Sequence, residues 1–210
     1  PIGYIPAGTT NDFAASLKLS ANILQATQDI LLGEPVAYDV GKFGNRYFSY
    51  VASFGAFTRT SYATSQKLKN LLGHSAYVLA GARELWRIKP IHMQVQADQV
   101  EVEGDFIFGA VCNSTSVAGV LTLDPARVNL SDGQFEVLLV RKPKNLRQLF
   151  KAVRALLKQT YDSPLITFCS AKHVQMTAET ELPWSLDGER EDSGTQIEIC
   201  NLHRAIRLVK

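Results

Sequence analysis

Two carboxylates flank a single glycine in the run Ser185-Leu186-Asp187-Gly188-Glu189. Carboxylates this close together, directly after a strand-like segment, can divide the roles of general base and charge stabiliser, or share a metal ion. An extended backbone would send both side chains to the same side. Asp-Gly is also the strongest short hairpin signal, so an ordinary turn is the alternative. Asp187 and Glu189 are therefore candidate catalytic residues.

A second Asp-Gly turn lies in the run Asn129-Leu130-Ser131-Asp132-Gly133-Gln134, between two β-rich segments. Hard cations such as Mg²⁺ prefer oxygen ligands, which the Asp132 carboxylate and nearby backbone carbonyls can supply. A plain turn is again the alternative. Together with an anion site at the start of the first predicted helix, described next, the two turns form a coherent set for phosphoryl transfer.

A glycine-containing turn near the start of the chain, Pro6-Ala7-Gly8-Thr9-Thr10-Asn11-Asp12, crowds hydrogen-bonding groups before a helical pattern. Asn11 or Asp12 can cap that helix. Free N–H groups and the helix dipole would suit a phosphate or the polar groups of a nucleotide. An ordinary capped helix is the competing interpretation.

The elements that must position these residues change character near Glu34. Residues 2–6 predict the end of a strand, and apolar spacing predicts one helix from Phe13 to about Leu32, a piece of α/β structure. From Val36 onward, short β-rich runs separated by turn residues predict a two-sheet antiparallel sandwich. The expected strands are Ala37–Lys42, Asn45–Ala52, His92–Gln96, Gln99–Glu103, Phe106–Asn113, Gly133–Val140, Ile166–Cys169, His173–Thr177, Leu182–Ser185, Thr195–Cys200 and Ala205–Val209.

Two helices are expected within the β-rich part, near Gln66–Trp86 and over Leu146–Lys158. Residues 141–158 carry seven basic residues and no acidic one. The stripe formed by Arg147, Lys151, Arg154 and Lys158 could dock on an anionic membrane, where each basic residue contributes about 1 kcal/mol. The alternative is the solvated face of a helix packed on the sandwich.

The composition excludes several classes of protein. With 210 residues, of which 46% are hydrophobic and 20% charged, the chain has enough apolar surface for a core and is not disordered. A net charge of +2 does not indicate a nucleic-acid binder, and no apolar run approaches the ~20 residues of a membrane span. The three cysteines form no CxxC pair and the four histidines have no metal-binding spacing within one element, which argues for reduced thiols and against a zinc site.

Four motifs, in order along nearly the whole chain, resemble the diacylglycerol kinase family, specifically its bacterial soluble branch, which is related to sphingosine kinases. They are Ile-Pro-Ala-Gly-Thr-Thr-Asn-Asp-Phe-Ala at 5–14, Ser-Tyr-Val-Ala-Ser-Phe-Gly-Ala-Phe at 49–57, Ser-Asp-Gly-Gln-Phe-Glu-Val at 131–137 and Leu-Asp-Gly-Glu at 186–189. The resemblance implies an α/β nucleotide-binding domain followed by a β-sandwich, with the active site between them. We accordingly expect a mainly β chain with some α, divided into residues 1–34, the end of the α/β domain, and residues 35–210, the sandwich.

The resemblance also implies roles for individual residues. Thr9, Asn11 and Asp12 would line the nucleotide side, and Asp187 or Glu189 would be the base that activates the lipid hydroxyl. Asp132, with the carbonyls of Asn129 and Gln134, would hold a structural Mg²⁺. The implied function is an ATP-dependent lipid kinase that converts diacylglycerol or a similar lipid to a phosphatidate. The alternatives are a sphingoid-base or other lipid kinase, and a non-catalytic lipid-binding or regulatory sandwich.

The chain departs from the family pattern in two places. The Gly-Gly-Asp-Gly-Thr phosphate loop that precedes the first motif in the family is absent, which predicts a truncated N-terminus and a fragment inactive on its own. After Asn113, Ser-Thr-Ser-Val-Ala-Gly stands where family members carry a glycine-rich loop. The expected setting is cytoplasmic and peripheral to the inner membrane surface, with a lipid as partner and no nucleic acid; a homodimer is compatible with it.

Overall fold

The computed structural model describes residues 1–8, 11–56, 86–117 and 121–210, and within these ranges strands dominate. Helices α1 (Asp12–Leu17) and α2 (Ile23–Leu32) come first, and helix α5 (Leu146–Leu157) interrupts the later strands. The strands are β1 (Pro35–Phe43), β2 (Arg46–Phe48), β3 (Val51–Gly55), β4 (Ile91–Ala97), β5 (Val100–Cys112), β6 (Ser116–Val117), β7 (Leu121–Thr122), β8 (Phe135–Arg141), β9 (Ile166–Ala171), β10 (His173–Ala178), β11 (Leu182–Leu186), β12 (Glu189–Ser193) and β13 (Gln196–Val209).

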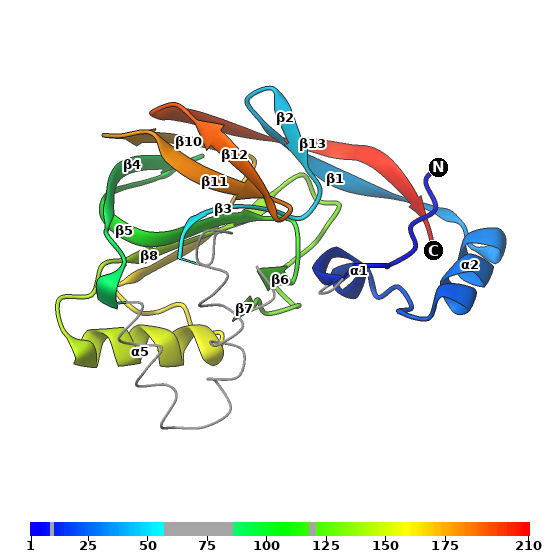
Figure 1. Ribbon diagram of the computed structural model, residues 1–210, viewed down its shortest axis with the longest axis horizontal. Coiled ribbons are helices and arrows are strands. Elements are labelled where there is room, and N and C mark those ends of the chain that lie inside the picture. The colour runs from blue at the N-terminus through cyan, green and yellow to red at the C-terminus, as the bar shows by residue number, and fades with distance from the viewer. Residues whose placement is uncertain (9–10, 57–85, 118–120) are drawn as a thin grey trace.

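Eleven of these strands form one antiparallel sheet in the order β12-β11-β3-β5-β4-β10-β13-β1-β2, with β8 between β5 and β9. The long strand β5 joins the two halves of the sheet. Residues 100–106 pair with β4, whereas residues 108–112 pair with β3 on one edge and β8 on the other. The sheet therefore curls over itself (Figure 1), and the predicted mainly β, sandwich-like fold is confirmed, with β5 continuous between the two layers.

The burial pattern explains why these segments are strands. In β4, buried Met93, Val95 and Ala97 alternate with exposed Gln94 and Gln96, as in a strand with one face on a core. The second half of β5 and most of β8 are instead buried on both faces. Their outer face packs with α5 and the β6–β7 pair, so both strands have continuous apolar runs.

Several predicted strand boundaries are corrected by the structure. The predicted strands 99–103 and 106–113 are one strand, β5, and the predicted strands 195–200 and 205–209 are one strand, β13. Each strand continues through one irregular backbone position. This position is Gly104 in β5, with φ of 152°, and Arg204 in β13, with φ of 52°. The predicted strand 45–52 is divided into β2 and β3, and β12 was not predicted because its sequence is almost entirely polar.

The predicted single helix from Phe13 to Leu32 is wrong. Helix α1 ends at Leu17, because Lys18 has a left-handed backbone (φ 58°). The second helix begins anew at Asn22, whose side chain accepts hydrogen bonds from the N–H groups of Leu24 and Gln25. An amide side chain at this position satisfies the free donors of a new helix.

The helix expected over 146–158 is confirmed as α5, which Asn145 caps by accepting a hydrogen bond from the Gln148 N–H at 2.9 Å. The helix expected near 66–86 lies almost wholly outside the described residues. Among the helices that are described, none is both long and apolar enough to cross a bilayer.

The N-terminal segment docks on the open end of the β1–β13 pair. Phe13 and Leu17 of α1 pack with Tyr38 and Leu208. Ile2 forms a parallel bridge with Leu208, which is less than the strand expected at residues 2–6 and brings the two chain ends close together (Figure 1).

Candidate functional site

The turn between β11 and β12 places the two candidate catalytic carboxylates in different environments. Asp187 (φ 50°) and Gly188 (φ 91°) both have a left-handed backbone, which is typical of a type I′ hairpin turn. The backbone is therefore not extended here, and the expectation that strand alternation sends both side chains to one side is wrong. Asp187 is partly buried, whereas Glu189 is exposed at the start of β12.

The carboxylate of Asp187 binds the backbone between β2 and β3. Its Oδ2 accepts a hydrogen bond from the Ser49 N–H at 2.5 Å, and its Oδ1 accepts from the Tyr50 and Val51 N–H groups at 3.0 Å each. Burial raises the pKa of the Asp187 carboxyl above its ordinary value, and these amide hydrogen bonds oppose the rise. Asp187 thus fixes the bend that divides β2 from β3.

Helix α1 reaches the same bend through aromatic contact. The rings of Phe13 and Tyr50 stack with centroids 6.0 Å apart and an interplanar angle of 23°. A Cβ placed on Gly188 would lie 3.9 Å from the Tyr50 hydroxyl, so the tip of the β11–β12 turn also lies beside Tyr50. In space, Tyr50 therefore lies between the motif at residues 5–14 and the motif at residues 186–189.

Two serine contacts fasten α1 to the segment that follows β5. Asp12 Oδ1 accepts a hydrogen bond from the Ser116 hydroxyl at 2.9 Å. The Ser16 and Ser114 hydroxyls lie 2.8 Å apart, both buried. The start of α1 is thus held beside β6.

Asn11 occupies the N-cap position of α1, and its carbonyl accepts the Ala15 N–H at 2.9 Å. Its backbone is left-handed (φ 50°), and its side chain makes no capping hydrogen bond to the helix. Instead, Asn11 Oδ1 accepts a hydrogen bond from the Gly8 N–H at 2.8 Å and closes the preceding turn. Asn11 is thus the N-cap residue by position, without the expected side-chain cap, while Thr9 lies outside the described residues.

The second Asp-Gly turn is stabilised by its own side chains. Asp132 is exposed, and its Oδ1 accepts a hydrogen bond from the Gln134 N–H at 3.0 Å. Asn129 Oδ1 accepts from the Ser131 N–H at 3.1 Å. The Gln134 carbonyl accepts a hydrogen bond from the Asn201 side chain at 3.2 Å. The Asp132 carboxylate and two nearby carbonyls thus lie in one short loop.

A buried carboxylate that the sequence analysis did not single out, Asp39, organises this loop. It is 1% exposed and lies in β1 opposite a bulge in β13. Its oxygens accept hydrogen bonds from the Gly133 N–H at 2.6 Å and the Arg204 N–H at 2.7 Å, and His203 Nδ1 lies 3.1 Å away. A charged residue inside the apolar run Val36-Ala37-Tyr38-Asp39-Val40 was the available signal, because buried charges are rare unless paired.

A second missed acidic residue, Glu136, follows the loop in β8. It is 1% exposed, and its Oε2 has no hydrogen-bond partner among the described residues. Burial, with the nearby negative charge of Asp132, raises the pKa of Glu136 to about 8. Two carboxyl groups thus lie close enough to interact, and one has an unsatisfied oxygen.

Asn113 connects the two turn regions. Its N–H donates to the Tyr50 carbonyl at 2.8 Å, and its side chain Nδ2 donates to the Asp39 carbonyl at 2.9 Å. A continuous set of hydrogen bonds therefore runs from Asp187 through residues 49–51, Asn113 and Asp39 to Gly133. The structure brings together α1, the β11–β12 turn and the 129–134 loop.

Two family models match this chain. The one described as the YegS C-terminal NAD kinase beta sandwich-like domain covers residues 51–203, and the one described as the diacylglycerol kinase catalytic domain covers residues 1–43. The first match therefore spans most of the curled sheet, and the second spans α1, α2 and β1.

Named relatives agree with these matches. A diacylglycerol kinase of Staphylococcus carnosus is 33% identical over 189 residues, and one of Bacillus subtilis is 30% identical over 211 residues. The matches cover 90% and 99% of this chain, but 61% and 68% of the relatives. The chain thus spans less than two thirds of the length of the S. carnosus protein.

A solved structure has the same fold. A diacylglycerol kinase from Bacillus anthracis str. Sterne superposes with a TM-score of 0.69 at 18% sequence identity. The superposition covers 98% of this chain and 65% of that one. At this identity, the likeness concerns the fold.

Proposed function

The chain belongs to the diacylglycerol kinase family, and we propose that it forms part of an ATP-dependent kinase that phosphorylates the hydroxyl of diacylglycerol or a similar lipid. One observation carries the proposal: α1, the β11–β12 turn and the 129–134 loop converge around Tyr50, Asn113 and Asp39. Phosphoryl transfer depends mainly on positioning and charge stabilisation. A rigid junction of three polar segments supplies the positioning.

Glu189 is the better candidate for the base. A lipid hydroxyl needs a carboxylate that accepts its proton as the phosphoryl group is transferred. Both oxygens of Asp187 already accept backbone hydrogen bonds, whereas the Glu189 side chain is exposed next to the turn. Asp187 then acts as a positioning residue that holds the bend at residues 49–51.

The start of α1 would line the nucleotide side of the site. Asn11 directly precedes α1, Asp12 is its first residue, and the next residue, Phe13, stacks on Tyr50. Thr9 precedes them in the sequence. ATP, when bound, supplies the phosphoryl group. In this arrangement, Asp12 holds the Ser116 hydroxyl, and Asn11 fixes the turn that leads into the helix.

The 129–134 loop fits a hard cation, because its donors are all oxygens. Asp132, with the carbonyls of Asn129 and Gln134, would hold Mg²⁺, and the buried Glu136 side chain near Asp132 has one oxygen without a hydrogen-bond partner among the described residues. When bound, Mg²⁺ would supply positive charge beside the Asp132 carboxylate and brace the loop that Asp39 anchors.

This assignment predicts a rise in melting temperature with added Mg²⁺, because a ligand that binds the native state stabilises it. Asp132→Asn should abolish the rise. Asp124→Asn is the matched control, because Asp124 lies in a similar turn where its Oδ1 accepts the Ala126 N–H. A Mg²⁺-dependent rise that persists in Asp132→Asn, or no rise in the unmutated protein, would show that Asp132 is an ordinary turn residue and not a Mg²⁺ ligand.

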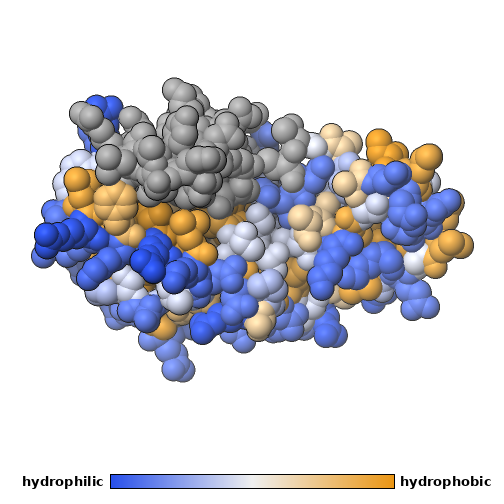
Figure 2. Space-filling view, turned by 90° about the horizontal axis from the view of Figure 1, so that it is seen from below, coloured by the Kyte–Doolittle hydropathy of each residue, from blue (hydrophilic) through white to orange (hydrophobic). Residues whose placement is uncertain are grey.

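Helix α5 offers a face for the anionic surface on which a lipid substrate lies. Its basic residues Arg147, Lys151, Arg154 and Lys158 are exposed. Leu146 and Leu157, at its two ends, are 50% and 48% exposed. Figure 2 shows hydrophilic and hydrophobic residues side by side on the left of the face that carries α5. Basic and apolar side chains together are typical of a helix that lies on an anionic membrane.

The direct test of the proposed function is an assay on the natural protein that contains this chain. Purified protein with labelled ATP and diacylglycerol in mixed micelles should yield labelled phosphatidate. A panel containing sphingoid bases and other lipids with free hydroxyls would identify the preferred substrate. If no lipid in the panel accepts phosphate from ATP, the kinase proposal fails.

A further inference from the structure

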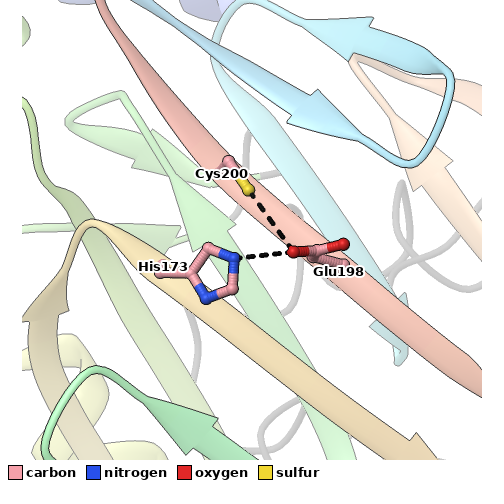
Figure 3. Close-up of side chains that lie close together, drawn as sticks. All are labelled: His173, Glu198 and Cys200. Carbon is pink, nitrogen blue, oxygen red and sulfur yellow. Dashed lines mark hydrogen bonds and ion pairs between the residues drawn. The ribbon is translucent and has the colours of Figure 1, made fainter.

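Three potential metal ligands meet on the outer face of the sheet. His173 lies on β10, and Glu198 and Cys200 lie on the neighbouring strand β13 (Figure 3). His173 is directly opposite Cys200 in the antiparallel register, and Glu198 precedes Cys200 by two residues on the same face. Ile197 and Ile199, the residues on either side of Glu198 in sequence, point into the core instead. Strand pairing therefore holds all three donors on one surface.

The three side chains are close to the spacing that a metal ion needs. His173 Nε2 lies 2.8 Å from Glu198 Oε1, Cys200 Sγ lies 4.0 Å from the same oxygen, and all the donor atoms lie within 4.8 Å of one another. Tetrahedral Zn²⁺ with bonds of about 2.0–2.3 Å separates its ligands by roughly 3.3–3.8 Å. Small side-chain rotations suffice to reach that geometry. The His173 and Glu198 side chains are 41% and 62% exposed, so an ion can enter from solvent.

We propose that His173, Glu198 and Cys200 form a Zn²⁺-binding site that links β10 to β13. An imidazole, a carboxylate and a thiolate together make a borderline-soft donor set, which suits Zn²⁺ and disfavours Mg²⁺. Water can fill the fourth position, because the His173 and Glu198 side chains that would hold the ion are exposed to solvent. The site does not depend on the proposed lipid kinase function.

Sequence spacing could not indicate this site, because its ligands come from two strands. The expectation of no zinc site rested on the absence of CxxC pairs and of regularly spaced histidines. Among the described residues, His173, Glu198 and Cys200 form the one group of three or more His, Cys, Asp or Glu side chains whose donor atoms lie close enough together to hold an ion.

Binding releases protons. Zn²⁺ binds the Cys200 thiolate and the neutral His173 imidazole, so the thiol proton, together with any proton on the imidazole, passes to the solvent. No electron is transferred and no covalent carbon bond changes. The affinity should therefore increase with pH, and protons should be released into a weakly buffered solution on titration with Zn²⁺.

The test uses Co²⁺ as a spectroscopic substitute for Zn²⁺, followed by competition with Zn²⁺, on the purified protein with reduced thiols. The expected result is a thiolate-to-cobalt charge-transfer band together with visible d–d bands of tetrahedral intensity, at one ion per chain. Zn²⁺ should displace these bands and raise the melting temperature. Cys200→Ser should remove the charge-transfer band, and His173→Gln should weaken Zn²⁺ binding by about tenfold or more.

Two control variants isolate the site. Cys169→Ser removes a different half-buried thiol, and His92→Gln removes a different exposed histidine that contacts carboxylates, Asp105 and Glu103. Both should bind Co²⁺ and Zn²⁺ as the unmutated protein does. Melting temperatures in chelator identify any variant that has lost its fold. A charge-transfer band that persists in Cys200→Ser, or no such band in the unmutated protein, overturns the proposal.

Discussion

Asp187 and Glu189 differ in their surroundings although one glycine separates them. Asp187 faces inward and satisfies three backbone N–H groups, whereas Glu189 lies exposed at the start of β12. The same pair of carboxylates can therefore serve one structural and one chemical purpose.

This division predicts different results for the two isosteric substitutions in the natural protein. Glu189→Gln should lower kcat by about 10²-fold or more and leave the melting temperature unchanged, because a base is lost without a packing change. Asp187→Asn should lower the free energy of unfolding by about 1–3 kcal/mol, because its amide NH₂ faces a backbone donor. Lipid kinase assays and urea unfolding of both variants are the measurements.

Glu181→Gln, which changes another exposed carboxylate just before β11, is the control and should affect neither quantity. Normal turnover in Glu189→Gln would place the base elsewhere. Unchanged stability in Asp187→Asn would contradict the structural role of that carboxylate.

Glu136 predicts a pH dependence of stability. Its pKa is raised from 4.5 to about 8, so the native state holds a proton between these values that the unfolded state has lost. The free energy of unfolding should therefore fall as pH rises through this window, by up to about 1.4 kcal/mol per pH unit. Urea unfolding in chelator across the window measures the slope, and Glu136→Gln should reduce it. An identical slope in Glu136→Gln would show that another group is responsible.

Among the elements, α5 is amphipathic: one side packs on the sheet and the other side is basic and exposed. Leu149 and Ala152 are buried, and Ala155 and Leu156 pack against the outer face of the sheet. The basic residues point outward, so the helix can remain packed while its outer face contacts lipid.

Reversing two of these charges should weaken membrane binding without unfolding the helix. Lys151→Glu combined with Arg154→Glu should reduce binding to phosphatidylglycerol-containing vesicles by about tenfold or more, since each basic residue contributes about 1 kcal/mol. Vesicle co-sedimentation at two salt concentrations measures the effect. Lys172→Glu, on an exposed turn between β9 and β10, is the control. Equal loss of binding in both proteins would indicate dependence on net charge instead of a docking face.

At the scale of the whole molecule, Asp39 joins segments that are far apart in the sequence. Its carboxylate holds the 129–134 loop and the bulge in β13, while its backbone carbonyl accepts from Asn113. Through Asn113, it is connected to the bend that Asp187 binds. One buried charge therefore braces the junction where the candidate site lies.

Asp39→Ala should consequently cause a large decrease in the free energy of unfolding. It leaves the buried Gly133 N–H and the partly buried Arg204 N–H without their acceptor, which should cost about 3 kcal/mol or more. Urea unfolding gives the magnitude, and hydrogen exchange of those two amides gives the location. Asp192→Ala, in exposed β12, should cost little. A loss below about 1 kcal/mol for Asp39→Ala would show that water replaces the carboxylate.

The sequence by itself predicted the mainly β character, most strand positions, α5 and both Asp-Gly turns. These features depend on local spacing: alternation along strands such as β4, a 3.6-residue period in α5 and the backbone freedom of glycine at position 188. The ordered motifs also identified the family, because they occupy most of the chain.

Only the tertiary structure decided which of these elements meet. The continuity of β5, the role of Asp39 and the pairing of His173 with Cys200 depend on strand register, which local spacing does not specify. The inward turn of Asp187 likewise results from its contacts with the distant residues 49–51. The surroundings of such side chains are formed by residues that are distant in the sequence. Their hydrogen bonding and charge therefore depend on the folded sheet and not on the local sequence.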